Sequence, residues 1–296
     1  MKNKYNISFL IIISFLFSSC YLVKVEKNDL DITLQPKHKE SLLSKNPESL
    51  NQKDKRVLVT IHGFSGTPYE NEKTINFIKS KKDNFIVSKI LLGKHGDIRL
   101  FRNSTWQDWQ KPIEEELDFL EKNNFKEVNI VANSTGATLL MELLNRKNHS
   151  NISKIVLVAP IVFPADKKMN LSPFFYYTGL IKAISNDLDE LQIGNWFREL
   201  PASSLYQLHL LTEHIQKNIN EGLKISKNIK IFVIQSKNDK VVDPISLEWW
   251  KKGLKNHSLE TLVVDSKYHL VVIDRPKNDE SELTNLVLEK INSFIN

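Results

Sequence analysis

Cysteine is almost absent from this 296-residue sequence, and the single one, Cys20, excludes any disulfide within the chain. Glycine and proline are also sparse, at nine and ten residues, and there is neither an internal repeat nor a low-complexity segment. The sequence further lacks a cluster of residues with metal-ligand spacing, a glycine-rich nucleotide loop and any cofactor signature. We therefore expect neither a metal nor another cofactor.

The overall composition is that of a globular protein. Hydrophobic residues make up 41% of the chain and charged residues 26%, which is typical of globular rather than disordered or membrane-embedded chains. The length allows one large core or two ordinary ones. The formal net charge is +6, but the lysines are scattered among acidic residues. This predicts a solvated surface and no nucleic-acid partner, and it leaves weak attraction to an anionic membrane surface open.

The N-terminus carries a long hydrophobic run. Lys2 and Lys4 precede the run ISFLIIISFLF, and the small residues of SSC follow it. A basic segment, an apolar run and small residues, in this order, are the pattern of a secretory signal. We therefore predict a signal peptide over residues 1–19.

Cys20 stands directly after this segment, and its surroundings resemble the lipobox of bacterial lipoproteins, with Phe17 where leucine is usual. The resemblance implies that Cys20 is acylated, becomes the mature N-terminus and anchors the protein to a membrane of the cell envelope. Two alternatives stay open: an ordinary cleaved signal in which Cys20 is incidental, and an uncleaved anchor over the uncharged residues 5–23. All three place the rest of the chain outside the cytoplasm.

Two patterns divide the remaining chain. Residues 20–55 are rich in Lys, Glu, Asn and Ser, and we interpret them as a tether with one short edge strand, LDITL, at 30–34. From residue 56 to 296, short β-branched runs alternate with longer amphipathic stretches. These predict strands near 57–61, 85–91, 128–132, 154–160, 230–236 and 260–265, and helices near 69–82, 107–123, from 134, near 245–254 and near 281–294.

The alternation with short connections predicts an α/β fold, in which a mostly parallel sheet is flanked by helices. Strands such as KIVLVA lack strict polar alternation, as expected where both faces are covered. The interval of about 161–225 is too long for a single crossover, so we predict an inserted cap there. Its aromatic-rich segments, LSPFFYYTGLIKAI and IGNWFRELP, fit either the core of the cap or the lining of an acyl pocket.

The segment VNIVANSTGATLLMELL places Ser134 directly between a predicted strand and a predicted helix. The serine must then occupy a tight turn between small residues, here Ala132 and Gly136. Such a turn presents the hydroxyl at the carboxyl edge of the sheet and directs a helix N-terminus at it. The usual form is G-x-S-x-G, from which Ala132 departs by one methyl group. On this motif alone, a simple helix N-cap is an equal alternative.

Three further segments favour a catalytic serine. IHGFSGTP follows a strand and can bring the Phe64 N–H beside the turn, where it would form an oxyanion hole with the Thr135 N–H. Asp239 lies three residues past one strand, and His269 lies four residues past the next. Because parallel strands deliver their loops to one edge, Ser134, Asp239 and His269 should converge, in the chain order found in α/β-hydrolases.

With these residues, the sequence from residue 56 onward resembles the α/β-hydrolases, and more narrowly their bacterial carboxylesterase and monoacylglycerol lipase branch. The resemblance rests on HGFSGTP, GKHGD, TWQDWQ, ANSTGA, SKNDKVV and SKYHLVVID. It implies the α/β-hydrolase fold with a cap, a triad of Ser134, Asp239 and His269, and an oxyanion donor at Phe64.

Other residues compete for these roles. Asp243 and Asp274 could supply the carboxylate, but Asp243 precedes a proline and suits a helix start, whereas Asp274 suits support of the histidine loop. His62 and His95 lie in glycine turns beside the predicted site, where shaping the loop is the commoner role of a histidine.

The sequence thus predicts a serine hydrolase that cleaves carboxylic esters, either short to medium acyl esters or monoacylglycerols, through an acyl-enzyme. A lysophospholipase, a thioesterase or an acyltransferase would use the same triad. A lipoprotein that kept the fold only for binding would need none of the three residues. We expect a small ester with an apolar acyl chain as substrate, and contact with a membrane through the lipid on Cys20.

Overall fold

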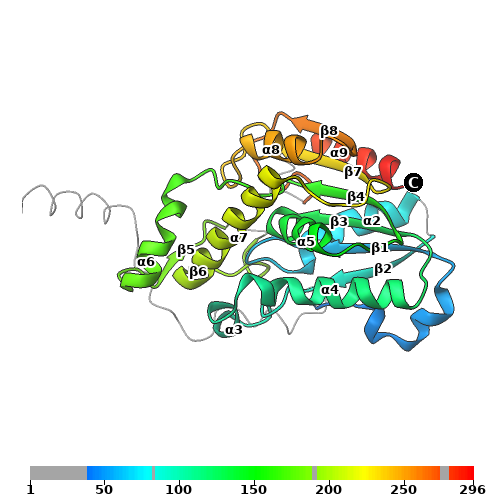
Figure 1. Cartoon of the computed structure of the whole chain (residues 1–296), viewed down its shortest axis with the longest axis horizontal. Coiled ribbons are helices and arrows are strands. Elements are labelled where there is room, and N and C mark those ends of the chain that lie inside the picture. The colour runs from blue at the N-terminus through cyan, green and yellow to red at the C-terminus, as the bar shows by residue number, and fades with distance from the viewer. Residues whose placement is uncertain (1–38, 82–83, 189–191, 274–279) are drawn as a thin grey trace, which may run out of the picture.

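The predicted strands form one six-stranded sheet in the computed structural model, which describes residues 39–81, 84–188, 192–273 and 280–296. Neighbouring strands are all parallel, so their carboxyl ends lie at the same edge (Figure 1). In sheet order the strands are β2 (Phe85–Ile90), β1 (Arg56–Ile61), β3 (Val128–Asn133), β4 (Ile152–Val158), β7 (Lys230–Ser236) and β8 (Ser258–Val264).

Several predictions fall on residues that the structure does not describe. The signal peptide, Cys20, the strand at 30–34 and Asp274 lie outside the described ranges. In the part of the chain that is described, no helix is both long enough and apolar enough to cross a membrane.

Each face of the sheet buries its own hydrophobic cluster, because successive strand residues point to opposite faces. In β1, for example, Val57 and Val59 belong to one cluster and Leu58 to the other. All six residues of β3 are buried, which explains its unbroken apolar pattern. The first face is covered by α4 (Trp106–Lys122), α5 (Ser134–Arg146) and α8 (Ile245–Gly253), and the second by α2 (Glu72–Lys81) and α9 (Ser281–Ile295).

The start of α4 shows how local sequence fixes these helices. Thr105 Oγ1 accepts the Asp108 N–H at 3.3 Å, and the Asp108 carboxylate accepts the Thr105 N–H at 2.8 Å, so the helix begins with a capping box. Trp109, Ile113 and Leu117 then recur at helical spacing and are buried. A short helix, α3 (Ile98–Arg102), precedes this cap.

The end of the predicted tether differs from our expectation, because it packs on the domain. It forms two short 3-10 helices, η3 (Leu43–Lys45) and η4 (Pro47–Gln52). The buried carboxylate of Glu116 in α4 accepts the Leu43 N–H at 2.8 Å, and Ser41 pairs with Lys89 of β2. Two adjacent buried leucines, Leu42 and Leu43, and the buried Glu116 therefore hold this segment on the domain. Two apolar residues are too few to show a helical or strand periodicity in the sequence.

The interval in which we predicted an insertion lies between β4 and β7. It contains η6 (Lys167–Leu171), α6 (Ser172–Thr178), the antiparallel pair β5 (Ala183–Ser185) and β6 (Glu199–Pro201), and α7 (Ala202–Glu221). Leu211 and Ile215 of α7 are fully buried in the cluster on the first face. Figure 1 shows α6, β5 and β6 gathered at the left, with α7 running from them back along the sheet. We call this insertion the cap.

Candidate active site

Ser134 occupies a tight turn between β3 and α5, and no residue separates the two elements. Its φ is +49°, in the left-handed region that costs a residue with a side chain about 1–3 kcal/mol. Asn133, rather than Ser134, is the N-cap residue of α5, so the alternative of a simple serine N-cap does not describe this turn. The turn has the backbone form of a nucleophile elbow.

Close backbone packing surrounds the elbow. A Cβ atom on Gly136 would lie 2.1 Å from the carbonyl oxygen of His62, so only glycine fits where α5 passes the end of β1. A Cβ atom on Gly63 would lie 3.1 Å from the Cβ of Ser134. The loop after β1, which continues into Phe64, therefore lies directly against the elbow.

Asp239 and His269 form a hydrogen-bonded pair in the loops after β7 and β8. His269 Nδ1 lies 2.8 Å from Asp239 Oδ2, and the other oxygen of Asp239 accepts the N–H groups of Val241 at 2.8 Å and Val242 at 3.0 Å. Asp239 is 5% exposed. The carboxylate is thus fixed by its own loop and holds the imidazole through Nδ1, the ring nitrogen opposite the one that would meet a hydroxyl.

The pair favours an ionised aspartate. Burial raises the pKa of Asp239, but the charge and hydrogen bond of His269, together with the two backbone N–H groups, outweigh burial and hold the pKa below its usual value. An ionised Asp239 stabilises the imidazolium that would form when His269 removes a proton.

Of the two predicted oxyanion donors, Thr135 follows Ser134 in the chain, and Phe64 belongs to the loop after β1 that packs against the elbow. Thr135 is the next residue of α5 after Ser134 and is buried. Phe64 follows Gly63, and its ring packs against Phe101 and Trp109, with centroids 5.3 and 5.7 Å apart. The backbone at Phe64 is therefore anchored by its own side chain.

His62 and His95 are buried in the loops after β1 and β2 and make backbone contacts. His62 Nε2 accepts the Leu92 N–H at 2.9 Å, while its Nδ1 lies 2.9 Å from the Gly63 carbonyl oxygen. Burial lowers the pKa of His62 to about 4, and burial together with the charge of His62 holds the pKa of His95 well below its usual value. Both histidines are therefore neutral at physiological pH and connect the two loops.

Of the two rival aspartates, Asp243 lies at a helix start. Asp243 accepts the Ile245 N–H at 3.0 Å at the start of α8. Asp274 lies outside the described residues, so its predicted role in the histidine loop stays a prediction.

Glu70 is a residue of the site that our reading of the sequence missed. It lies in η5 (Pro68–Asn71) and is 1% exposed. Glu70 Oε2 accepts the Gly63 N–H at 2.8 Å and the Asn133 side-chain N–H at 3.3 Å, and the charge of Glu70 interacts with that of His269. The loop after β1 and the residue before Ser134 therefore meet at this carboxylate, within the electrostatic range of His269. Nothing in the sequence separates it from the many exposed glutamates.

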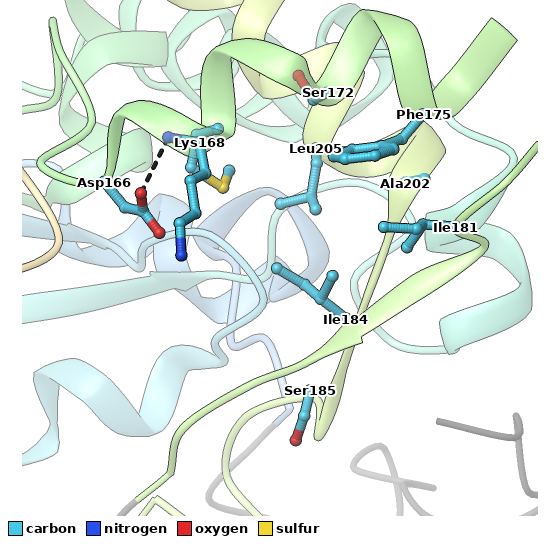
Figure 2. Close-up of a pocket in the computed structure, with 10 residues that line it drawn as sticks. Asp166, Lys168, Ser172, Phe175, Ile181, Ile184, Ser185, Ala202 and Leu205 are labelled. Atoms are coloured by element: carbon cyan, nitrogen blue, oxygen red, sulfur yellow. Dashed lines mark hydrogen bonds between the residues drawn. The ribbon is translucent and has the colours of Figure 1, made fainter. Parts of the chain in front are cut away.

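The cap contains an apolar cavity of about 240 Å³. Figure 2 shows Leu205 of α7, Ile184 of β5 and Ile181 extending toward a common space beneath α6. A smaller pocket shares Leu205 and Met169 with this cavity and reaches Ile161. The carbonyl oxygen of Ile161 accepts the hydroxyl of Thr138, one turn into α5 from the elbow, at 2.6 Å. The smaller pocket therefore reaches a residue that is hydrogen-bonded to α5 one turn after Ser134.

Metal ligands do not gather in the described ranges: no three His, Cys, Asp or Glu residues there could hold an ion together.

Several solved structures are similar to this chain in their overall fold. One of the metagenome-derived lipolytic enzymes LipS and LipT gives a TM-score of 0.66 at 17% identity, over 88% of this chain and 98% of that one. The monoacylglycerol lipase of Paleococcus ferrophilus gives a TM-score of 0.56 at 13% identity, over 80% of this chain and 94% of that one. A soluble variant of the monoglyceride lipase of Saccharomyces cerevisiae, in complex with a substrate analogue, gives a TM-score of 0.61 at 11% identity. The match covers 81% of this chain and 87% of that one.

No protein-family model and no curated protein sequence matches the chain. At identities this low the structural likeness concerns the fold alone. The predicted fold class is confirmed: the chain has the α/β-hydrolase fold, with a mostly parallel sheet flanked by helices.

Proposed function

We propose that this chain is a serine hydrolase that cleaves carboxylic esters through an acyl-enzyme on Ser134. One observation carries the proposal: a serine in a left-handed elbow lies at the same sheet edge as a buried, hydrogen-bonded Asp239–His269 pair. A protein that kept this fold only for binding would need neither the strained serine nor the oriented histidine.

In this mechanism His269 Nε2 removes the proton of Ser134, and Oγ attacks the ester carbonyl carbon. The Phe64 and Thr135 N–H groups hold the oxyanion. His269 then gives its proton to the leaving alcohol, and water repeats the sequence to release the acid. Asp239 keeps the imidazole in the tautomer that carries its proton on Nδ1.

The apolar cavity of the cap supports a substrate with an acyl chain. At about 240 Å³, lined by side chains such as Leu205 and Ile184, it can take up a short to medium chain. The neighbours named as lipolytic enzymes and monoacylglycerol lipases agree with that class. Monoacylglycerols and short to medium acyl esters are therefore the substrates we propose.

We further propose that the protein is held in the cell envelope by a lipid on Cys20, because the apolar run and SSC resemble a lipoprotein signal. Metabolic labelling with a radioactive fatty acid should mark the wild-type chain and leave Cys20→Ser unlabelled. Equal labelling of both would contradict the anchor.

Reaction of the full-length chain with a fluorophosphonate probe tests the enzymatic proposal. We expect the label on Ser134, its loss in Ser134→Ala, and its retention in the control Ser150→Ala at an exposed loop position. Turnover of p-nitrophenyl esters should fall in Ser134→Ala on the order of 10⁶-fold. Folded wild-type protein that takes up no label would refute the mechanism, and ester products formed with an added alcohol would indicate an acyltransferase.

A further inference from the structure

Glu70 is a buried carboxyl group that the acyl-transfer steps above do not use. It connects three parts of the molecule that are distant in sequence. Gly63, in the loop that carries the proposed oxyanion donor, donates its N–H at 2.8 Å. Asn133, which precedes the nucleophile, donates its side-chain N–H at 3.3 Å. Trp196 of the cap donates its indole N–H.

The packing around Gly66 indicates that this position of Glu70 is built into the fold. A Cβ atom on Gly66 would lie 2.0 Å from Glu70 Oε1 and 2.9 Å from Trp196 Nε1. Glycine at residue 66 therefore lets the loop after β1 close over the carboxylate and the indole together. A larger residue would force the three groups apart.

The partners of Glu70 suit its ionised form. All three partners are donors, and a carboxylate accepts hydrogen bonds whereas a carboxylic acid also needs an acceptor. Among the titratable and charged groups around it, His269 from the loop after β8 acts on it through its charge. Tyr69, Glu72 and Lys73 line a cavity beside it. Burial raises the pKa of Glu70 to about 7, although the Gly63 N–H, Asn133, His269 and Trp196 all act to lower it.

We propose that Glu70 is a positioning residue for acyl transfer. Its carboxylate holds the oxyanion loop, the elbow and the cap in one arrangement, and its negative charge stabilises the imidazolium that His269 forms during the reaction. The inference rests on the proposed function, since it concerns the same serine and histidine. In addition to Asp239, Glu70 is then a second carboxylate that acts on His269.

The test uses the full-length chain with Glu70→Gln, Trp196→Phe and the control Glu116→Gln. Glu116 is a matched control because it is fully buried, accepts the Leu43 N–H at 2.8 Å and the Ser88 hydroxyl at 2.6 Å, and belongs to none of the active-site loops. The first readout is the rate of fluorophosphonate labelling, and of p-nitrophenyl ester turnover, between pH 5 and pH 9.

We expect Glu70→Gln to lower kcat by about 10- to 100-fold with little change in KM, as a displaced catalytic geometry would. The acidic limb of its kcat/KM profile should move to lower pH, because the charge that favours the imidazolium is gone. Trp196→Phe should move that limb in the same direction by a smaller amount, because losing a donor disfavours ionised Glu70 and so leaves less negative charge near the imidazolium. Glu116→Gln should leave the profile where it is.

The second readout does not depend on turnover. The ring-proton resonances of His269 are followed by NMR through the same pH range, with the other histidines as internal references. In Glu70→Gln they should titrate at lower pH than in the wild type, and in Glu116→Gln at the same pH. Should Glu70→Gln fail to fold, Trp196→Phe carries the same test, with a shift of the same sign and smaller size.

Two results would overturn the positioning role. One is a folded Glu70→Gln variant with the wild-type rate and pH profile. The other is a loss of rate matched by Glu116→Gln with no movement of the acidic limb. Failure of the proposed function would look different, because wild-type protein would show neither label nor turnover. The NMR titration then still decides whether Glu70 acts on His269, and an unchanged titration overturns the inference.

Discussion

Replacing Glu70 with glutamine should make the protein more stable relative to the wild type as the pH rises. Burial moves the pKa of Glu70 from 4.5 to about 7, so the folded state binds a proton that the unfolded chain releases at lower pH. A group whose pKa is raised on folding contributes stability that is fully present below the unfolded value and is lost as the pH rises through the folded value. The wild type should therefore lose stability between about pH 4.5 and pH 7.

The size of the effect follows from the shift. At about 1.4 kcal/mol for each pKa unit, ionising Glu70 at this site costs about 3 kcal/mol of unfolding free energy above pH 7. Glutamine has no charge to bury and does not titrate. The difference between Glu70→Gln and the wild type should therefore shift in favour of the variant by up to about 3 kcal/mol between pH 5 and pH 8.

Urea unfolding at a series of pH values measures this difference. Glu116→Gln serves again as the control, because it shows what replacing a buried glutamate costs away from the site. A free-energy difference between Glu70→Gln and the wild type that stays constant from pH 5 to pH 8 would refute the reasoning. It would mean that Glu70 keeps an ordinary carboxyl titration in the folded protein.

Two further substitutions test the elbow and the cap. In urea unfolding, the free energy of unfolding of Ser134→Gly should exceed that of Ser134→Ala by about 1 kcal/mol, because only glycine adopts a φ of +49° without steric cost. Equal stability of the two variants would mean that the turn is unstrained. Leu205→Trp should reduce kcat/KM for decanoyl esters at least about 10-fold relative to acetyl esters, because the indole occupies the cap cavity; an unchanged chain-length profile would place the acyl chain elsewhere.

The inner strands of the sheet could be predicted from the sequence because both of their faces are buried. Each of the six strands predicted from residue 57 onward lies within two residues of the observed one at both ends, since runs such as VLVTI contrast sharply with the polar turns around them. The cap was predicted only as an interval. Leu208, Leu211 and Ile215 of α7 do recur at helical spacing, but the sequence does not say which surface that helix covers.

Some residues of the candidate site could be predicted from the sequence, and one could not. Ser134, Asp239 and His269 could be proposed because each follows a predicted strand, and parallel strands bring such positions to one edge. Glu70 could not be proposed from the sequence, because its place in the site comes from burial beneath Trp196, a residue of the cap far along the chain. Burial of a single polar side chain by a distant segment leaves no local pattern.

The cap also has a part in holding the site together. A left-handed serine costs about 1–3 kcal/mol and an ionised buried Glu70 about 3 kcal/mol, against a total stability of about 5–15 kcal/mol for a typical domain. Close contacts must offset these costs. Trp196 donates to Glu70, and the neighbouring Phe197 N–H donates to the Ser65 carbonyl oxygen at 3.0 Å in the loop after β1. A substrate that displaces the cap would weaken both contacts, and its binding in the cap cavity would then be energetically coupled to the arrangement of the elbow.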